Sequence, residues 1–468
     1  MSTKLVLLVL SLGTLMAAVD TTIVLLALPT ITLDLHTDLL TSIWVLLSYL
    51  LVLAVLTTQT GRIGDIVGRS KIYNSGFIIF TLASALAGAS ANIYELIAFR
   101  AIQAIGGAML TANSNAIIAD VFPPNERGRA FGITSLGWNI GALLGIVLGG
   151  ILTTFFGWRF IFYINVPIGI VAVVIGLREI KDVNKVKASL DIPGAVILGV
   201  SLTLISLSVM FISANGVAME YIVELLVGLL LLPAFIYNET KVKMPIINLS
   251  IFKIRLLSFS LISSFLQGVG ALALTFLLIM YLQGVRGLSP LDSSLLLTPS
   301  YIIASVLAPI MGRKADKGSP GVIAGIGLLF IFASLMMYYF LITPSTPLYD
   351  ILWISAITGI GSSMFWPSNS AAIMLLAPKQ YYGAVSGIAR TLGSIGTVLS
   401  YVLSISVATL SIPRHVAFEI LLGTNALDPK TGAVFVDGLH FAFLISAVII
   451  VVAAIFSFIS GVKRKVEE

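Results

Sequence analysis

The chain has no cysteine and few charged residues. Of its 468 residues, 58% are hydrophobic and only 10% are charged, whereas soluble domains carry about 25% charged residues. A soluble fold of this length could not cover so much apolar surface, so the sequence predicts an all-α integral membrane protein. The missing cysteines exclude disulfides, thiolate chemistry and Cys-ligated metals.

Groups for catalysis or metal binding are also scarce. The three histidines are His36, His415 and His440, and they form no ligand cluster in the sequence. There is no phosphate-binding Gly-Lys loop and no glycine-rich dinucleotide turn. We therefore expect no cofactor, no metal and no enzymatic activity, and any transport must draw on a gradient. The net charge of +6 fits Lys and Arg in cytoplasmic loops better than nucleic-acid binding.

Long apolar runs dominate what is present. A helix needs about 20 apolar residues to cross a bilayer, and the sequence contains fourteen runs of about that length. If the N-terminus is inside, the cytoplasmic segments hold 21 of the 27 Lys and Arg residues and the external segments hold four. This asymmetry predicts fourteen transmembrane helices with both termini in the cytoplasm. The runs are 5–28, 40–60, 72–91, 94–119, 130–155, 160–177, 192–213, 219–238, 257–282, 292–311, 321–342, 348–374, 383–410 and 440–461.

A charged, glycine-containing stretch occurs twice. Residues Gly61–Lys71 read GRIGDIVGRSK, and Gly312–Gly318 repeat its Gly-Arg-x-x-Asp pattern, each between two apolar runs. We interpret both as short cytoplasmic loops. The spacing of Pro123, Gly128 and Gly132 likewise recurs at Pro378, Gly383 and Gly387. Helices 1–6 thus match helices 9–14 as parallel repeats, which predicts a six-helix bundle at 1–180, an inserted helix pair at 181–250 and a second six-helix bundle at 251–468.

Asp20 and Arg100 are the ionisable residues that we place deepest in the first half. At 1.5 Å per residue, they lie roughly 12 Å and roughly 9 Å from the external ends of their helices, so they can pair. Asp20 either makes a structural hydrogen bond or is a titratable site for protons or cationic substrate. Arg100 favours the ionised carboxylate and desolvation opposes it. Our hypothesis is that proton binding loosens the pair. Glu224, nearer a helix end, is expected to reach the interface.

Further candidates concern packing and a cavity. Small residues at four-residue spacing let another helix approach closely, either as static packing or as a moving interface; they are Gly137, Gly141, Gly145 and Gly149. Polar and aromatic residues within the helices suit an amphipathic pocket, although each could equally be a packing residue or an interfacial anchor. These are Trp44, Tyr49, Asn113, Asn139, Gln267, Tyr301, Trp366 and Asn369.

Several motifs together resemble the major facilitator superfamily, and within it the fourteen-helix drug:proton antiporter family of the multidrug and quaternary ammonium efflux type. Residues Gly61–Lys71 resemble the superfamily's loop between helices 2 and 3. Arg100–Gln103, followed by Gly106 and Gly107, resembles the helix 4 motif, whose arginine is implicated in proton coupling. Asp20–Pro29 resembles the helix 1 motif, in which the aspartate is a proton or cation site, and Trp158–Pro167 resembles the entry to helix 6.

Three positions depart from the family pattern. Leu25 stands where the helix 1 motif usually carries asparagine, and Ala104 replaces a usual glycine in helix 4. Ile146 follows Gly145 where the helix 5 antiporter motif usually has proline. The lost proline should make this helix straighter and leaves the antiport direction open.

The resemblance implies a proton-coupled exporter of lipophilic or cationic drugs that works by alternating access in the plasma or inner membrane. We expect a monomer whose partners are a small-molecule substrate, protons and lipid. A proton symporter, or an exporter of a specific metabolite, is the alternative. The charged repeats would act as a conformational gate rather than as static loops, with Asp65 either bonding a helix N-terminus or pairing with an arginine such as Arg69. The gate residues are Gly61, Arg62, Asp65, Gly68, Arg69, Gly312, Arg313 and Asp316.

Overall fold

The fold is helical throughout the part of the chain that the structure describes. The computed structural model describes residues 3–122, 127–180, 190–215, 217–243, 245, 247, 249–271, 274–377, 382–410 and 429–461, and no strand occurs in these ranges. Each of the fourteen predicted runs coincides with a helix or with consecutive helices. Eleven helices in these ranges are long and apolar enough to cross a membrane. The all-helical membrane class is therefore confirmed, and the number fourteen stays a prediction.

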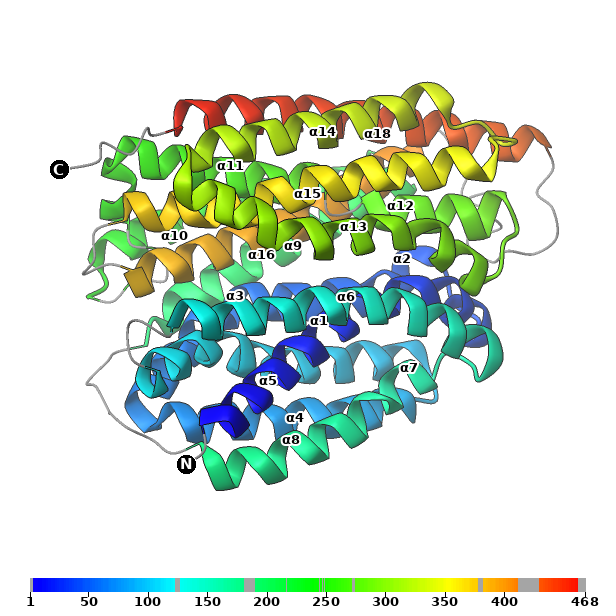
Figure 1. Ribbon diagram of the computed structural model, residues 1–468. Coiled ribbons are helices and arrows are strands. Elements are labelled where there is room, and N and C mark those ends of the chain that lie inside the picture. The colour runs from blue at the N-terminus through cyan, green and yellow to red at the C-terminus, as the bar shows by residue number, and fades with distance from the viewer. Residues whose placement is uncertain are drawn as a thin grey trace. The chain divides into compact units, whose positions relative to one another are not determined.

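The chain divides into two compact units, which Figure 1 colours from blue to red along the sequence. The first unit comprises Met1–Thr203, Val227–Ile246 and Leu288–Ser294. Its helices are α1 (Thr3–Asp34), α2 (Leu39–Ser42), α3 (Trp44–Val67), α4 (Arg69–Gly88), α5 (Ile93–Val121), α6 (Arg127–Phe155), α7 (Phe160–Tyr163) and α8 (Asn165–Glu179).

The second unit comprises Leu204–Leu226, Ile247–Gly287 and Leu295–Glu468. Helices α9 (Ile192–Asn215) and α10 (Met219–Lys241) are divided between the units, and the helix that begins at Pro290 has its first residues, up to Ser294, in the first unit. The three-part division inferred from the sequence remains a prediction. The other elements are η1 (Leu249–Lys253), α11 (Arg255–Ala271), α12 (Leu274–Met280), the π-helical turn η2 (Tyr281–Val285), α13 (Pro290–Lys317), α14 (Pro320–Leu341), α15 (Leu348–Leu376), α16 (Tyr382–Leu410) and α18 (Pro429–Ile459).

The prediction that Gly61–Lys71 forms a loop is wrong. Helix α3 continues to Val67, and α4 begins at Arg69. The turn consists of Gly68, whose φ of 127° and ψ of 123° are accessible to glycine and rarely to other residues. The earlier glycines do not break the helix, because a helical glycine costs only about 1 kcal/mol and close packing offsets it. Likewise, Gly312 lies inside α13, which ends only at Lys317.

Glycine contacts support the internal repeat. In the first unit, the backbones of α4 and α5 cross at Gly76 and Gly106, where a Cβ on Gly106 would lie 2.7 Å from the Gly76 carbonyl oxygen. In the second unit, α14 and α15 cross at Gly327 and Gly361, with the same 2.7 Å separation. Gly327 lies as far from Gly312 as Gly76 lies from Gly61. Both units therefore use the same crossing at matching sequence positions.

Candidate functional site

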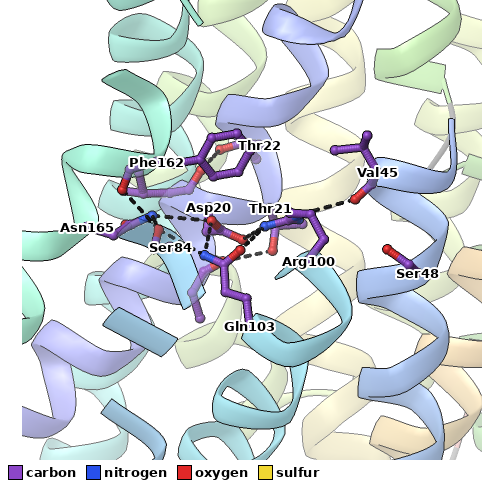
Figure 2. Close-up of polar contacts among 12 residues, drawn as sticks. Asp20, Thr21, Thr22, Val45, Ser48, Ser84, Arg100, Gln103, Phe162 and Asn165 are labelled. Atoms are coloured by element: carbon purple, nitrogen blue, oxygen red, sulfur yellow. Dashed lines mark hydrogen bonds and ion pairs between the residues drawn. The ribbon is translucent and has the colours of Figure 1, made fainter. Parts of the chain in front are cut away.

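The site is built inside the first unit around a buried carboxylate on α1. Asp20 has no exposed surface, and Arg100 on α5 is 1% exposed. The Arg100 Nη1 donates to Asp20 Oδ2 over 2.6 Å. Figure 2 shows the two side chains pointing toward each other from their helices. The pairing expected from their depths is present, and because both groups are desolvated, the loss of one partner would leave an uncompensated buried charge.

Gln103, one helical turn after Arg100, closes a three-membered network. Its Nε2 donates to Asp20 Oδ1 over 2.8 Å, and its Oε1 accepts from Arg100 Nη1 over 2.6 Å. Residues three apart share a helix face, so α5 presents both side chains to the carboxylate. The amide thereby contacts the anion and the cation at once. The sequence contained Gln103 in the helix 4 motif, but its role was not predicted.

Two more helices complete the shell around Asp20. Asn165, at the start of α8, donates through Nδ2 to Asp20 Oδ1 over 3.3 Å and to Ser84 Oγ over 3.1 Å. Ser84 on α4 donates in turn to the Phe162 carbonyl oxygen over 2.9 Å. Ser84 and Asn165 are fully buried. Asn165 lies within the Trp158–Pro167 motif, but its role was not predicted. Ser84 was missed, and no signal in the sequence pointed to it.

The cation of the pair is held by α3. Arg100 Nε donates to the Val45 carbonyl oxygen over 3.1 Å. The Tyr49 ring lies 4.3 Å from the guanidinium carbon, a distance at which a cation–π contact contributes about 2 kcal/mol when desolvated. Tyr49, proposed for a substrate cavity, is thus 2% exposed and engaged with Arg100.

The glycine stripe of α6 lies against α1, the helix that carries Asp20. A Cβ on Gly141 would lie 2.5 Å from the Leu15 carbonyl oxygen, and one on Gly137 would lie 3.0 Å from the Ser11 carbonyl oxygen. Gly145 and Gly149 meet the next turns of α1 in the same way. The hydroxyls of Thr14 and Thr22 donate to carbonyl groups of α6. The stripe therefore sets the position of the helix that holds the carboxylate.

The gate motif joins α3, α4 and α5. Arg69 pairs with Asp120 on α5 over 2.8 Å, an ion pair that was not predicted. Asn113 packs against Gly64 and donates to the Thr60 carbonyl oxygen over 3.3 Å. This cavity candidate therefore contacts α3, as Tyr49 contacts Arg100. The side chains of Arg62, Asp65 and Asp316 lie outside the described part, which leaves the proposed contact between Asp65 and Arg69 a prediction. Arg313 is exposed.

The remaining cavity candidates differ in burial. Gln267 on α11 and Asn369 on α15 are each 2% exposed, and their amide oxygens have no hydrogen-bond partner among the described residues. Trp44, Asn139 and Tyr301 are half-buried, and Trp366 is 39% exposed. Their part in a substrate cavity remains a prediction. Glu224 on α10 is half-buried, and its Oε2 is buried without a hydrogen-bond partner in the part of the chain that the structure describes.

The second unit repeats one contact of the site without its charge. Ser355 on α15 donates to the Leu296 carbonyl oxygen of α13 over 3.2 Å. Ser355 lies as far before Gly383 as Arg100 lies before Gly128, and Leu296 precedes Gly312 by the same interval as Val45 precedes Gly61. The serine thus takes the place of the arginine. Of the two matching positions, only the one in the first unit carries a charge.

Comparison with known proteins gives a consistent result. Residues 10–401 match the family model of the Major Facilitator Superfamily. The riboflavin transporter RibZ of Clostridioides difficile is 33% identical over 84% of this chain and 86% of its own length. Multidrug resistance protein 3 of Bacillus subtilis is 31% identical over 85% of this chain and 78% of its own. The tetracenomycin C resistance and export protein of Streptomyces glaucescens is 30% identical over 86% and 76%.

Solved structures agree on the fold. A bacterial homologue of the human lysosomal transporter Spinster, in an inward-facing and occupied conformation, has a TM-score of 0.65 at 18% identity and covers 97% of this chain and 96% of its own. A peptide transporter in complex with sulfate has the same TM-score at 15% identity, covering 97% and 95%.

Proposed function

Because the chain belongs to the major facilitator superfamily, whose members are transporters rather than enzymes, we propose that it is a proton-coupled exporter of lipophilic or cationic compounds. The observation that carries this proposal is the buried Asp20–Arg100 pair. A fully buried carboxylate in a membrane helix is costly to maintain and usually functional. Three donors converge on Asp20, from Arg100, Gln103 and Asn165. The guanidinium balances the charge of the carboxylate, and a proton bound to Asp20 would weaken its hydrogen bonds to all three donors.

The proposed cycle couples the proton to the conformation of the first unit. In the ionised state, Asp20 binds α1 to α5 and α8 through these donors. A proton on the carboxylate removes the charge that orients them, so the contact between α1 and α5 weakens, while Arg100 keeps its contacts with Gln103, the Val45 carbonyl oxygen and the Tyr49 ring. The glycine stripe on the opposite side of α1 allows this helix to move without side-chain collisions. Proton binding then favours one of two transport conformations.

The architecture that goes with this function is fourteen membrane helices. We propose two six-helix bundles in parallel repeat with α9 and α10 inserted between them, both termini in the cytoplasm, and a monomer in the plasma or inner membrane. The matching spacing of glycine contacts in the two units supports the repeat. The gate formed by the ends of α3 and α4, and by the end of α13, would open and close the cytoplasmic side.

Relatives favour two classes of substrate. Multidrug resistance and tetracenomycin C export proteins support efflux of lipophilic drugs, which would enter a pocket lined by the predicted aromatic and amide side chains. The riboflavin transporter RibZ, at 33% identity, supports the second candidate, transport of a specific planar metabolite. Symport with protons is the alternative to antiport for either substrate. The antiport direction is open because the proline that usually follows the helix 5 glycine is replaced here by Ile146.

Transport in proteoliposomes with an imposed pH gradient tests the proposal. Ethidium, tetraphenylphosphonium and riboflavin are offered to the wild-type protein and to Asp20→Asn. We expect a lipophilic cation to move against the proton flux and Asp20→Asn to abolish uphill movement while exchange at equal pH persists. Movement of the substrate with the protons would replace antiport by symport. Uphill transport by Asp20→Asn at the wild-type rate would rule out Asp20 as the coupling residue.

A further inference from the structure

A second buried carboxylate, Asp191, lies outside the transport site. It immediately precedes α9 and has no exposed surface. Its Oδ1 accepts from the Gly194 backbone N–H over 2.9 Å, and both carboxylate oxygens accept from Asn238 Nδ2 of α10, over 3.0 and 3.2 Å. The side chain of Asp191 therefore ties the start of α9 to the end of α10.

The backbone of Asp191 is bound to α3. Gln59 Nε2 donates to the Asp191 carbonyl oxygen over 3.0 Å, and Gln59 Oε1 accepts from the Asp191 N–H over 3.3 Å. Gln59 is 5% exposed, so water competes little for these bonds and a lost partner would be costly. One residue of the inserted pair is thus fixed to α3 by two reciprocal hydrogen bonds.

This contact bears on the gate because Gln59 lies just before the gate motif in the sequence. Thr60 follows directly, and Gly61 then begins the gate motif, which stays helical as far as Val67. On α5, Asn113 donates to the Thr60 carbonyl oxygen. The last two turns of α3 are therefore held by α5 through Asn113 and by α9 and α10 through Asp191.

We propose that Asp191 is a positioning residue for the gate, which fixes the end of α3 to α9 and α10 so that these three ends move as one body. The inserted helices would then have a mechanical role in the cycle. This inference rests on the proposed transport function only where efflux is the readout, because the position of α3 can be measured without transport.

Asn238→Asp tests the proposal directly. It places two carboxylates where a carboxylate and an amide now meet, and like charges at this distance repel. The reciprocal variant Asp191→Asn/Asn238→Asp restores one acid facing one amide, and the amide oxygen introduced at position 191 can still accept from the Gly194 N–H. This matched pair separates the loss of the contact from the mere presence of new residues.

Accessibility of the gate is the first readout. The chain has no cysteine, so Val67→Cys, at a position 42% exposed, provides a single reporter for modification by a maleimide. In that background, we expect Asn238→Asp to change the modification rate at least about fivefold, which corresponds to about 1 kcal/mol, and the reciprocal variant to return it to within twofold of the parent. Ethidium efflux should fall and recover in parallel.

Two results would overturn the proposal. The first is an unchanged modification rate in folded Asn238→Asp, and the second is a reciprocal variant that behaves like the single one. If Asn238→Asp does not fold, Asp191→Asn alone, which removes the charge at constant shape, is compared with the parent in the same assay and must change the rate. If the parent moves none of ethidium, tetraphenylphosphonium and riboflavin, the proposed transport function fails, while the accessibility result still decides the role of Asp191.

Discussion

The free-energy coupling between Asp20 and Arg100 can be predicted from their burial. Replacing Arg100 with glutamine removes the cation and leaves the Asp20 carboxylate with only the donors Gln103 and Asn165. It also takes the donor away from the Val45 carbonyl oxygen. Breaking a buried pair in this way costs about 3–5 kcal/mol of unfolding free energy. Asp20→Asn leaves the buried guanidinium without its anion, and we expect a loss of similar size.

The double variant distinguishes coupling from two separate losses. With neither charge present, Asp20→Asn/Arg100→Gln should be more stable than the sum of the single losses predicts, by at least about 1 kcal/mol, because no uncompensated charge remains. Equilibrium unfolding in mixed detergent micelles measures all four proteins. The exposed pair Arg159–Asp34, 2.7 Å apart, is the control and should show coupling below about 1 kcal/mol. Additive losses at Asp20 and Arg100 would refute a strongly coupled pair.

Three further predictions concern close packing, backbone geometry and a hydrogen bond to Asp20. Gly141→Ala should lower the unfolding free energy by about 1–3 kcal/mol, because its new Cβ meets backbone atoms of α1. Gly393→Ala, whose Cβ lies within 4 Å of no described neighbour, should be neutral or slightly stabilising. Gly68→Ala should cost about 1–3 kcal/mol, because of its φ of 127°, while Gly61→Ala, whose Cβ would make an ordinary 3.5 Å contact, should be tolerated; equal thermal shifts at both glycines would contradict the strained turn. Asn165→Leu should reduce stability by about 1–3 kcal/mol and slow proton-driven efflux, and unchanged efflux in a folded variant would remove this side chain from the coupling network.

The asymmetry of the two units follows from single residues. Both units cross their helices at paired glycines, yet the first unit carries Arg100 where the second carries Ser355. Serine satisfies the matching carbonyl oxygen without bringing a charge into the interior. At these two matching positions, only the first unit bears the cost of burying an ion pair, and this is where we place proton coupling.

Some predictions failed because local sequence does not decide helix ends. A charged stretch with three glycines resembles a loop, but Gly61 and Gly64 pack against Ala112 and Asn113 of α5, and those contacts keep the segment helical. Conversely, Gly68 is the turn because the backbone there takes a conformation that other residues avoid. No property of the printed sequence distinguishes the third glycine from the first two.

The sequence by itself determined the membrane class, and it predicted the two related halves and the depth of Asp20 and Arg100, because apolar run length, charge asymmetry and helical rise are local properties. The tertiary structure decided which other side chains contact Asp20 and Arg100. Gln103 could be placed on the face of Arg100 from its spacing, but Ser84 and Asn165 reach the carboxylate from α4 and α8 only because helix packing brings these segments together. Contacts between residues so distant in the chain depend on the shapes of several helices at once, which composition and periodicity do not encode.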